Sequence, residues 1–344
     1  MEPVRKLNAV SAAAYAAAGT HTLKKLGVHH LSRSSLDQLL ECTNKFHFKS
    51  RFKTAKTTML LGNICHAVLE QIANVLIPWL EAKKDPLFET PEEFQTFLAE
   101  YRAFKDAELD KADIAGMLLQ SAQNQLMDLA ASQTEILYAD GMTHQEFRNE
   151  ILAAVETMAK SVTKEHYKWL LEYPVVASEA PVVYMPKEGA IPYLGYVDML
   201  TIGPNGKYRI VDLKSTFSSN QNIWNSAMTK FQLWLYGKSL MQMGFCDYMP
   251  EVEIKRITID TGSRRKVKPS VFKVTLDNGV LPDIESYDRK FQHMLSFADK
   301  MIADGIEVFA HSQYGCESCE YLPVCDQAVI PGDWERSSGG VECD

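Results

Sequence analysis

The sequence pattern changes abruptly near residue 173, and this change limits the folds that the chain can adopt. Residues 91–173 are almost free of Gly and Pro and repeat their apolar residues at helical spacing. The next three segments, 175–185, 191–202 and 208–216, are short, rich in Val, Ile and Tyr, and separated by Gly, Pro or Asn. The sequence therefore predicts an α/β protein in which three strands of one sheet follow a long helical stretch.

Segments on either side of this change add further elements. Apolar residues at every fourth position predict a helix over about 59–80, and a shorter helix is expected to end near Cys42. After the three strands we predict a helix over 231–244, strands over 252–260 and 271–278, and a helix over 284–304. The expected architecture is a central mixed sheet flanked by helices, divided into an N-terminal arm (1–30), a core (31–80 and 173–344) and a helical insertion (81–172).

Composition favours a soluble cytoplasmic protein without a membrane partner. No apolar run reaches the roughly 18 residues of a membrane span, and seven cysteines in 344 residues do not form a disulfide framework. A net charge of -8 argues against indiscriminate coating of nucleic acid. Locally, residues 45–56 carry five Lys or Arg, three Phe and no acid, which suits either phosphate and base binding or an amphipathic helix end. A second basic group at 264–268 is predicted to form a hairpin tip or loop, most often a solvated turn.

Two predicted strands carry a constellation of carboxylates and a lysine. Asp212 and Lys214 are two residues apart, so they point from the same face, while Leu213 faces the core. Asp198 lies on the neighbouring strand among apolar residues, where an unpaired carboxylate is costly. Because a tight turn joins the two strands, Asp198 and Asp212 can converge on one ion. The alternatives are a compensated surface charge pair at Asp212 and a turn or cap role for Asp198.

The donor set of this constellation fits Mg²⁺ or Mn²⁺. Both ions prefer oxygen ligands, and two Asp side chains with the Leu213 carbonyl meet that preference. His66 is the candidate nitrogen ligand, although a histidine in an apolar helix is more often a hydrogen-bonded core residue.

These motifs resemble those of RecB-type nucleases in the PD-(D/E)xK superfamily. The resemblance rests on residues 62–70, the Asp198 strand, the 212–214 strand and the helix with Gln232 and Tyr236. It implies a restriction-endonuclease-like sheet and a distinct role for each matching residue. By this resemblance the metal ligands are His66, Asp198, Asp212 and the Leu213 carbonyl, Lys214 assists catalysis, Gln232 and Tyr236 line the DNA path, and Glu179 is an additional acid.

A cysteine group near the C-terminus predicts a second metal centre. Cys316 and Cys319 form a C-x-x-C pair and Cys325 follows six residues later, a spacing that binds one metal or cluster. Cys42 resembles the single upstream cysteine of the iron-sulfur subgroup of these nucleases, which includes AddB and the small CRISPR adaptation nucleases. The resemblance implies a structural [4Fe-4S] cluster on four cysteines, with Zn²⁺ as the alternative. Cys343 could replace Cys42 as the fourth ligand.

The resemblance implies a Mg²⁺- or Mn²⁺-dependent deoxyribonuclease. We expect exonuclease action on single-stranded DNA or DNA ends, leaving a 5'-phosphate, in recombination, repair, CRISPR adaptation or phage DNA processing. The sequence lacks a G-x-x-x-x-G-K-[ST] motif, so unwound DNA would come from a helicase or recombination partner. The alternatives are a non-catalytic end-binding or assembly module that keeps the fold and cluster, and, with less support, an iron-sulfur redox protein.

Overall fold

The structure is a computed structural model. It describes residues 52–83, 90–138, 141–185, 192–203, 205–216, 227–258 and 268–274, together with eight single residues: Ser32, Lys45, Phe88, Arg289, His293, Cys319, Tyr321 and Cys325. The expected arm over 1–30, most of the short helix before Cys42 and most of the helix over 284–304 lie outside these residues.

A five-stranded mixed sheet forms the centre of the described chain. Its strands are β3 (Val175–Tyr184), β4 (Tyr193–Ile202), β5 (Tyr208–Thr216), β6 (Glu251–Thr258) and β7 (Lys268–Val274), in that spatial order. Neighbouring strands are antiparallel except β5 and β6, which are parallel. A parallel pair needs a crossover, and α9 (Ala227–Gln242) lies between β5 and β6 in the chain. The predicted mixed sheet is therefore confirmed.

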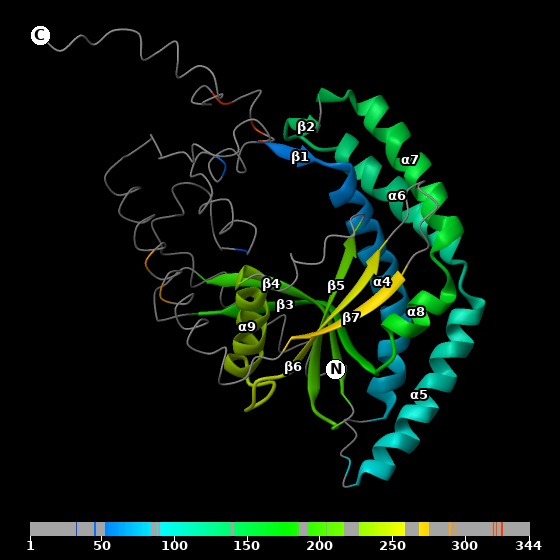
Figure 1. Cartoon of the computed structure of the whole chain (residues 1–344), viewed down its shortest axis with the longest axis vertical. Coiled ribbons are helices and arrows are strands. Elements are labelled where there is room, and N and C mark those ends of the chain that lie inside the picture. The colour runs from blue at the N-terminus through cyan, green and yellow to red at the C-terminus, as the bar shows by residue number, and fades with distance from the viewer. Residues whose placement is uncertain are drawn as a thin grey trace, which may run out of the picture.

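Helices cover both faces of the sheet (Figure 1). On one side lie the helices α4 (Thr57–Ala82), α5 (Pro91–Lys111), α6 (Ile114–Ala130), α7 (His144–Ser161) and α8 (Lys164–Leu170), and on the other lies α9. Local signals set several of these helix ends. Thr90 and Thr143 each form a capping box with the Glu three residues later, and Asp113 caps α6.

Two hydrophobic clusters fill the space between the helices and the sheet. One contains α4 and residues of α5–α8 together with Met199 of β4 and Val211 of β5. The other joins α9 to the opposite sheet face, where Leu200 and Ile210 are buried. The helices after α4 therefore share a continuous core with the sheet, which fixes α4 against the strands.

The apolar character of α4 serves this core. Among the described residues it is the one helix long and apolar enough to cross a membrane, with a mean hydropathy of 1.4 over an 18-residue window. It reaches this value as an average, because Asn63, His66 and Glu70 interrupt the apolar residues of α4. Half of the window is buried within the protein, as expected for a core helix.

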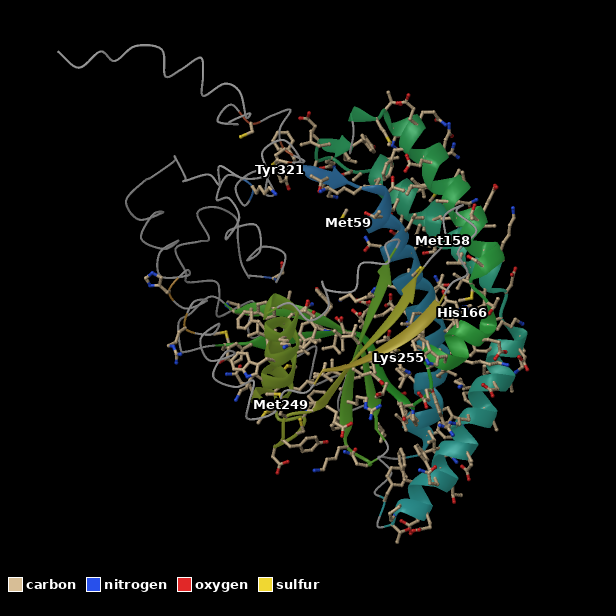
Figure 2. The ribbon with its side chains drawn as sticks, viewed as in Figure 1. Met59, Met158, His166, Met249, Lys255 and Tyr321 are labelled. Atoms are coloured by element: carbon tan, nitrogen blue, oxygen red, sulfur yellow. The ribbon has the colours of Figure 1, made fainter. Side chains whose placement is uncertain are left out.

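Lys255 joins the sheet to the end of α8 (Figure 2). Its ammonium group donates hydrogen bonds to the carbonyl oxygens of Trp169 at 2.9 Å and Leu170 at 3.3 Å. It also lies 5.1 Å from the centre of the Trp169 ring. Only 1% of Lys255 is exposed, and this burial lowers its pKa. The side chain thus satisfies carbonyls at the C-terminus of α8.

Two local predictions require correction. A short parallel pair forms between β1 (Lys53–Ala55) and β2 (Ile136–Tyr138), so residues 53–55 are not a helix end and the stretch over 91–173 is not wholly helical. Three-residue strands are too short to give a periodic pattern, so pairing decides their structure. Lys268, expected in a hairpin tip, is the first residue of β7 and pairs with Thr258.

Candidate active site

The side-chain alternation of β3 and β4 shifts at one level of the sheet. Ala177 and Ala180 both pack in the α9 cluster, and so do Val197 and Leu200, although residues three apart on a regular strand face opposite sides. Between the members of each pair lie Glu179 and Asp198, which the register pairs Ser178–Met199 and Ala180–Val197 flank. Glu179 has a φ of 47°, in the left-handed region that residues other than Gly rarely adopt. The chain therefore holds strain at the point where two carboxylates meet.

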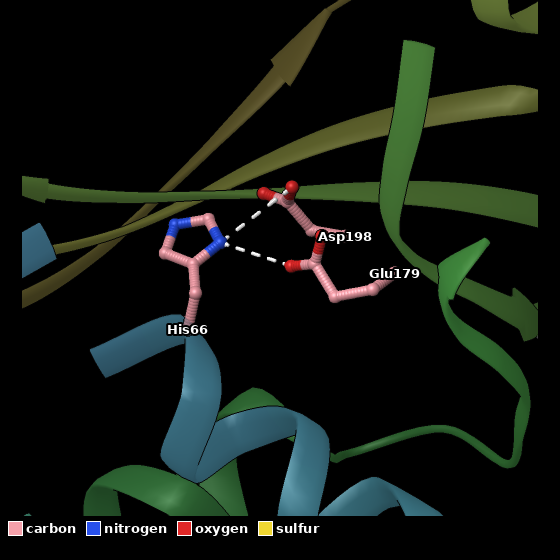
Figure 3. A group of neighbouring side chains, drawn as sticks. All are labelled: His66, Glu179 and Asp198. Carbon is pink, nitrogen blue, oxygen red and sulfur yellow. Dashed lines mark hydrogen bonds and ion pairs between the residues drawn. The ribbon is translucent and has the colours of Figure 1, made fainter. Parts of the chain in front are cut away.

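His66 approaches these carboxylates from α4 (Figure 3). Its Nδ1 atom lies 3.3 Å from Glu179 Oε1 and 3.6 Å from Asp198 Oδ1. Leu69 and Ala73, three and seven residues after His66, are buried, and His66 shares their face of α4, which packs against the sheet. The ligand atoms of His66, Glu179 and Asp198 lie within 4.8 Å of one another, a geometry that could hold a metal ion.

Asp198 links this group to β5. Its Oδ2 atom accepts a hydrogen bond of 2.6 Å from the backbone N–H of Leu213, next to the last paired residues of the β4–β5 ladder. Burial raises the pKa of Asp198 to about 6; the charge of His66 opposes this shift and that of Asp212 adds to it. Burial also disfavours protonation of His66, but Asp198 and Glu179 outweigh it and raise the pKa of His66.

Asp212 and Lys214 lie on β5 beside the three-residue group. Lys214 Nζ is 2.7 Å from Asp212 Oδ2. Only 1% of Asp212 is exposed, and within the described chain its Oδ2 atom accepts no hydrogen bond of suitable geometry. Val211 and Leu213 pack in the α4 cluster, so alternation turns Asp212 and Lys214 toward α9. The charge of Asp212 still acts on Asp198, so Asp212 lies close to the His66 group without being one of its three members.

The helix α9 contributes a tyrosine above β4. Gln232 Nε2 donates a 2.5 Å hydrogen bond to the hydroxyl oxygen of Tyr236. Burial, together with the neighbouring Tyr193 and the charge of Asp212, raises the pKa of Tyr236 well above its ordinary value. The ring approaches β4 closely, because a Cβ atom on Gly195 would lie 2.4 Å from Tyr236 Cε1. Gly195 therefore permits the contact that brings Tyr236 to the carboxylates.

The structure gathers most of the predicted site residues and leaves others outside its described part. His66, Glu179 and Asp198 form the tight group, Asp212 and Lys214 adjoin it, and Gln232 and Tyr236 face β4 from α9. Leu213 contributes its backbone N–H to Asp198. Sequence reasoning missed Gly195, whose signal was a glycine inside an apolar strand.

Half of the predicted cysteine ligands lie outside the described residues. Cys42 and Cys316 lie outside the described chain, whereas Cys319 and Cys325 are described and partly buried. The proposed thiolate centre therefore remains a prediction from spacing and resemblance.

The chain is similar to one known protein family and to solved structures. Residues 30–326 match the model of the PD-(D/E)XK nuclease superfamily, and no curated protein matches the chain. A solved structure of a candidate exonuclease from Eubacterium rectale is 11% identical, with a TM-score of 0.49 over 90% of this chain and 94% of that one. The structure of the protein SSO0001 is 12% identical, with a TM-score of 0.30 over 61% of this chain and 95% of that one. Because the family match spans most of its length, the chain belongs to the PD-(D/E)XK nuclease superfamily.

Proposed function

We propose that this protein is a metal-dependent deoxyribonuclease that hydrolyses phosphodiester bonds in single-stranded DNA or at DNA ends. The observation that carries the proposal is the convergence of His66, Glu179 and Asp198 within 4.8 Å, beside the 2.7 Å pair of Lys214 and Asp212. Membership of a nuclease superfamily makes phosphodiester hydrolysis the chemistry to test at this group.

The residues present fit a divalent cation. Carboxylate oxygens dominate the donor set, which favours Mg²⁺ or Mn²⁺, and one imidazole nitrogen is compatible with Mn²⁺. The Asp212 carboxylate, whose Oδ2 atom lies 2.7 Å from Lys214 Nζ, is a further oxygen ligand. We assign His66, Asp198, Asp212 and the Leu213 carbonyl as ligands, with Glu179 as an additional acid. When bound, the cation would polarise the scissile phosphate and acidify a water molecule.

The remaining side chains orient the reacting groups. Lys214 holds a positive charge beside Asp212, where it can position the attacking water or stabilise negative charge on a phosphate oxygen. The hydrogen bond from Gln232 fixes the Tyr236 hydroxyl, which can then donate its own proton to the DNA backbone. The hydrogen bond from the Leu213 N–H holds the Asp198 carboxylate of β4 against β5.

The cysteines extend the proposal to a second centre. Cys319 and Cys325 are partly buried thiols in the chain order that a cluster site requires. We assign them, with Cys42 and Cys316, to a structural [4Fe-4S] cluster, with Zn²⁺ as the alternative. Ultraviolet–visible absorption and metal analysis of the anaerobically purified protein distinguish the two. The pathways proposed are recombination, repair, CRISPR adaptation or phage DNA processing, with a helicase or recombination protein supplying unwound DNA.

Cleavage of end-labelled single-stranded DNA tests the proposed activity. The purified full-length protein is incubated with Mg²⁺, Mn²⁺ or EDTA, and the wild type is compared with Asp212→Asn, Lys214→Ala and the charge-matched control Lys207→Ala. Lys207 is exposed in the turn before β5. We expect metal-dependent degradation that is lost in the first two variants and kept in the third. Intact DNA with every metal, together with retained DNA binding, would replace the proposal with a non-catalytic end-binding module.

A further inference from the structure

Tyr196 is an exposed aromatic residue beside the candidate active site. Half of its surface is exposed (50%), and it lies two residues before Asp198 on β4. Among the described residues, the other strongly exposed large apolar side chains are Met59, Val75 and Met127, none of which is aromatic. An exposed tyrosine ring offers a flat apolar surface with a polar edge.

The ring points to the face of the sheet on which His66 lies. Gly195 faces Tyr236 of α9, and Val197 is fully buried in the α9 cluster. Because neighbouring residues on a strand alternate, Tyr196 turns away from α9. Its register partner Pro181 also faces away from α9, because the residues on either side of Pro181 pack against α9.

Tyr196 lies two residues along β4 from Asp198, on the same face of the sheet. The register pairs Ala180 with Val197, next to Glu179 and Asp198, then Pro181 with Tyr196, and further along Val183 with Leu194. Residues two apart on a strand are separated by about 6.6 Å. The Val183–Leu194 pair is buried, so the exposed ring stands between the candidate metal site and the closed end of the hairpin.

We propose that Tyr196 stacks on the nucleobase beside the scissile phosphate and thereby selects single-stranded DNA. A phosphate held at the carboxylates places the adjoining base within reach of a side chain one step along the hairpin. Every base has an apolar face, so stacking on tyrosine binds single strands without reading their sequence. In a duplex that face is already stacked on its neighbours. The inference rests on the proposed nuclease function and adds to it the residue that would select a single strand.

Binding to normal and abasic DNA tests this inference. Fluorescence anisotropy in Mg²⁺ measures the affinity of the full-length Asp212→Asn protein, which does not cut the probe, for single-stranded oligothymidine, an abasic strand of equal length and a duplex. We expect Tyr196→Ala to bind oligothymidine about 5-fold or more weakly, with little change on the abasic strand or the duplex. Tyr196→Phe keeps the ring and should retain the affinity. Met127→Ala, which removes another exposed apolar side chain from the distant α6, serves as the control.

The outcomes separate the inference from the proposed function. If Tyr196→Ala binds all three probes as the parent does, while Lys214→Ala still abolishes cleavage in the otherwise wild-type protein, stacking by Tyr196 is refuted and the nuclease proposal stands. If the wild-type protein cleaves none of the probes with Mg²⁺ or Mn²⁺, the proposed function fails and the inference with it. An equal loss of affinity for all three probes, including the abasic strand, would show a structural effect of the substitution and also overturn base stacking.

Discussion

Replacing Asp198 with asparagine should stabilise the metal-free protein while removing its metal binding. Burial raises the pKa of Asp198 from 3.8 to about 6, so the folded protein holds this proton more tightly than the unfolded chain does. Above about pH 6 the ionised carboxylate therefore opposes folding, and below about pH 4 the cost is absent. A shift of about 2 pH units corresponds to about 3 kcal/mol.

Asparagine removes this charge and keeps an oxygen that can accept the hydrogen bond from the N–H of Leu213. The loss of the charged partner of His66 offsets part of this effect, so we expect a gain of about 1–3 kcal/mol in the free energy of unfolding at pH 8 and little change at about pH 3. Asp198→Ala also removes the charge but leaves the Leu213 N–H without its acceptor. It should be about 1–3 kcal/mol less stable than the asparagine variant.

Urea unfolding in EDTA at both pH values measures these differences, and added Mg²⁺ should stabilise the wild type alone. An asparagine variant less stable than the wild type at pH 8 in EDTA would refute the argument that burial of Asp198 opposes folding. If Mg²⁺ stabilised the Asp198→Asn protein as strongly as the wild type, Asp198 would not be a metal ligand.

Three further substitutions test how the site is supported. Gly195→Ala should lower stability by about 1–3 kcal/mol, because its Cβ would lie 2.4 Å from Tyr236 Cε1, and adding Tyr236→Ala should recover part of the loss; strictly additive effects in urea unfolding would contradict the contact. Glu179→Gly should be about 1 kcal/mol more stable than Glu179→Ala in EDTA, since glycine adopts the positive φ without strain, and equal melting temperatures would argue against strain. Lys255→Met should cost about 2–3 kcal/mol by leaving carbonyls of α8 unpaired; wild-type stability in chemical denaturation would show that water or other groups replace the ammonium.

The strands of the site were predictable because their sequences are locally consistent. Short runs rich in Val, Ile and Tyr predicted strands over 175–185, 191–202 and 208–216, and the structure has β3, β4 and β5 at nearly these residues. The reasoning that a buried Asp198 needs a partner also identified a real constraint, since its oxygens contact the Leu213 N–H and His66.

Other features depend on contacts that no local pattern reports. The strand β2 is three residues long and exists as the partner of β1, more than 80 residues away. The positive φ of Glu179 follows from its place in the hairpin and not from glutamate, which disfavours this conformation. The need for a glycine at position 195 follows from the tertiary contact with the ring of Tyr236, which leaves no room for a Cβ atom.

The site forms where the side chains of β3 and β4 depart from regular alternation. The two hydrophobic clusters explain why this irregularity is stable. At the level of Glu179 and Asp198 the strands shift their alternation, yet apolar residues before and after the shift are buried against α4 and α9. With regular alternation, the apolar residues on one side of the shift would move to the opposite face of the sheet and become exposed. This exposure would cost about 1.5–3 kcal/mol of folding free energy for each large side chain. Strain of about 1–3 kcal/mol at one left-handed residue is smaller than that loss. The packing of ordinary hydrophobic residues therefore holds two mutually repelling carboxylates together, in the position where a cation would relieve their repulsion.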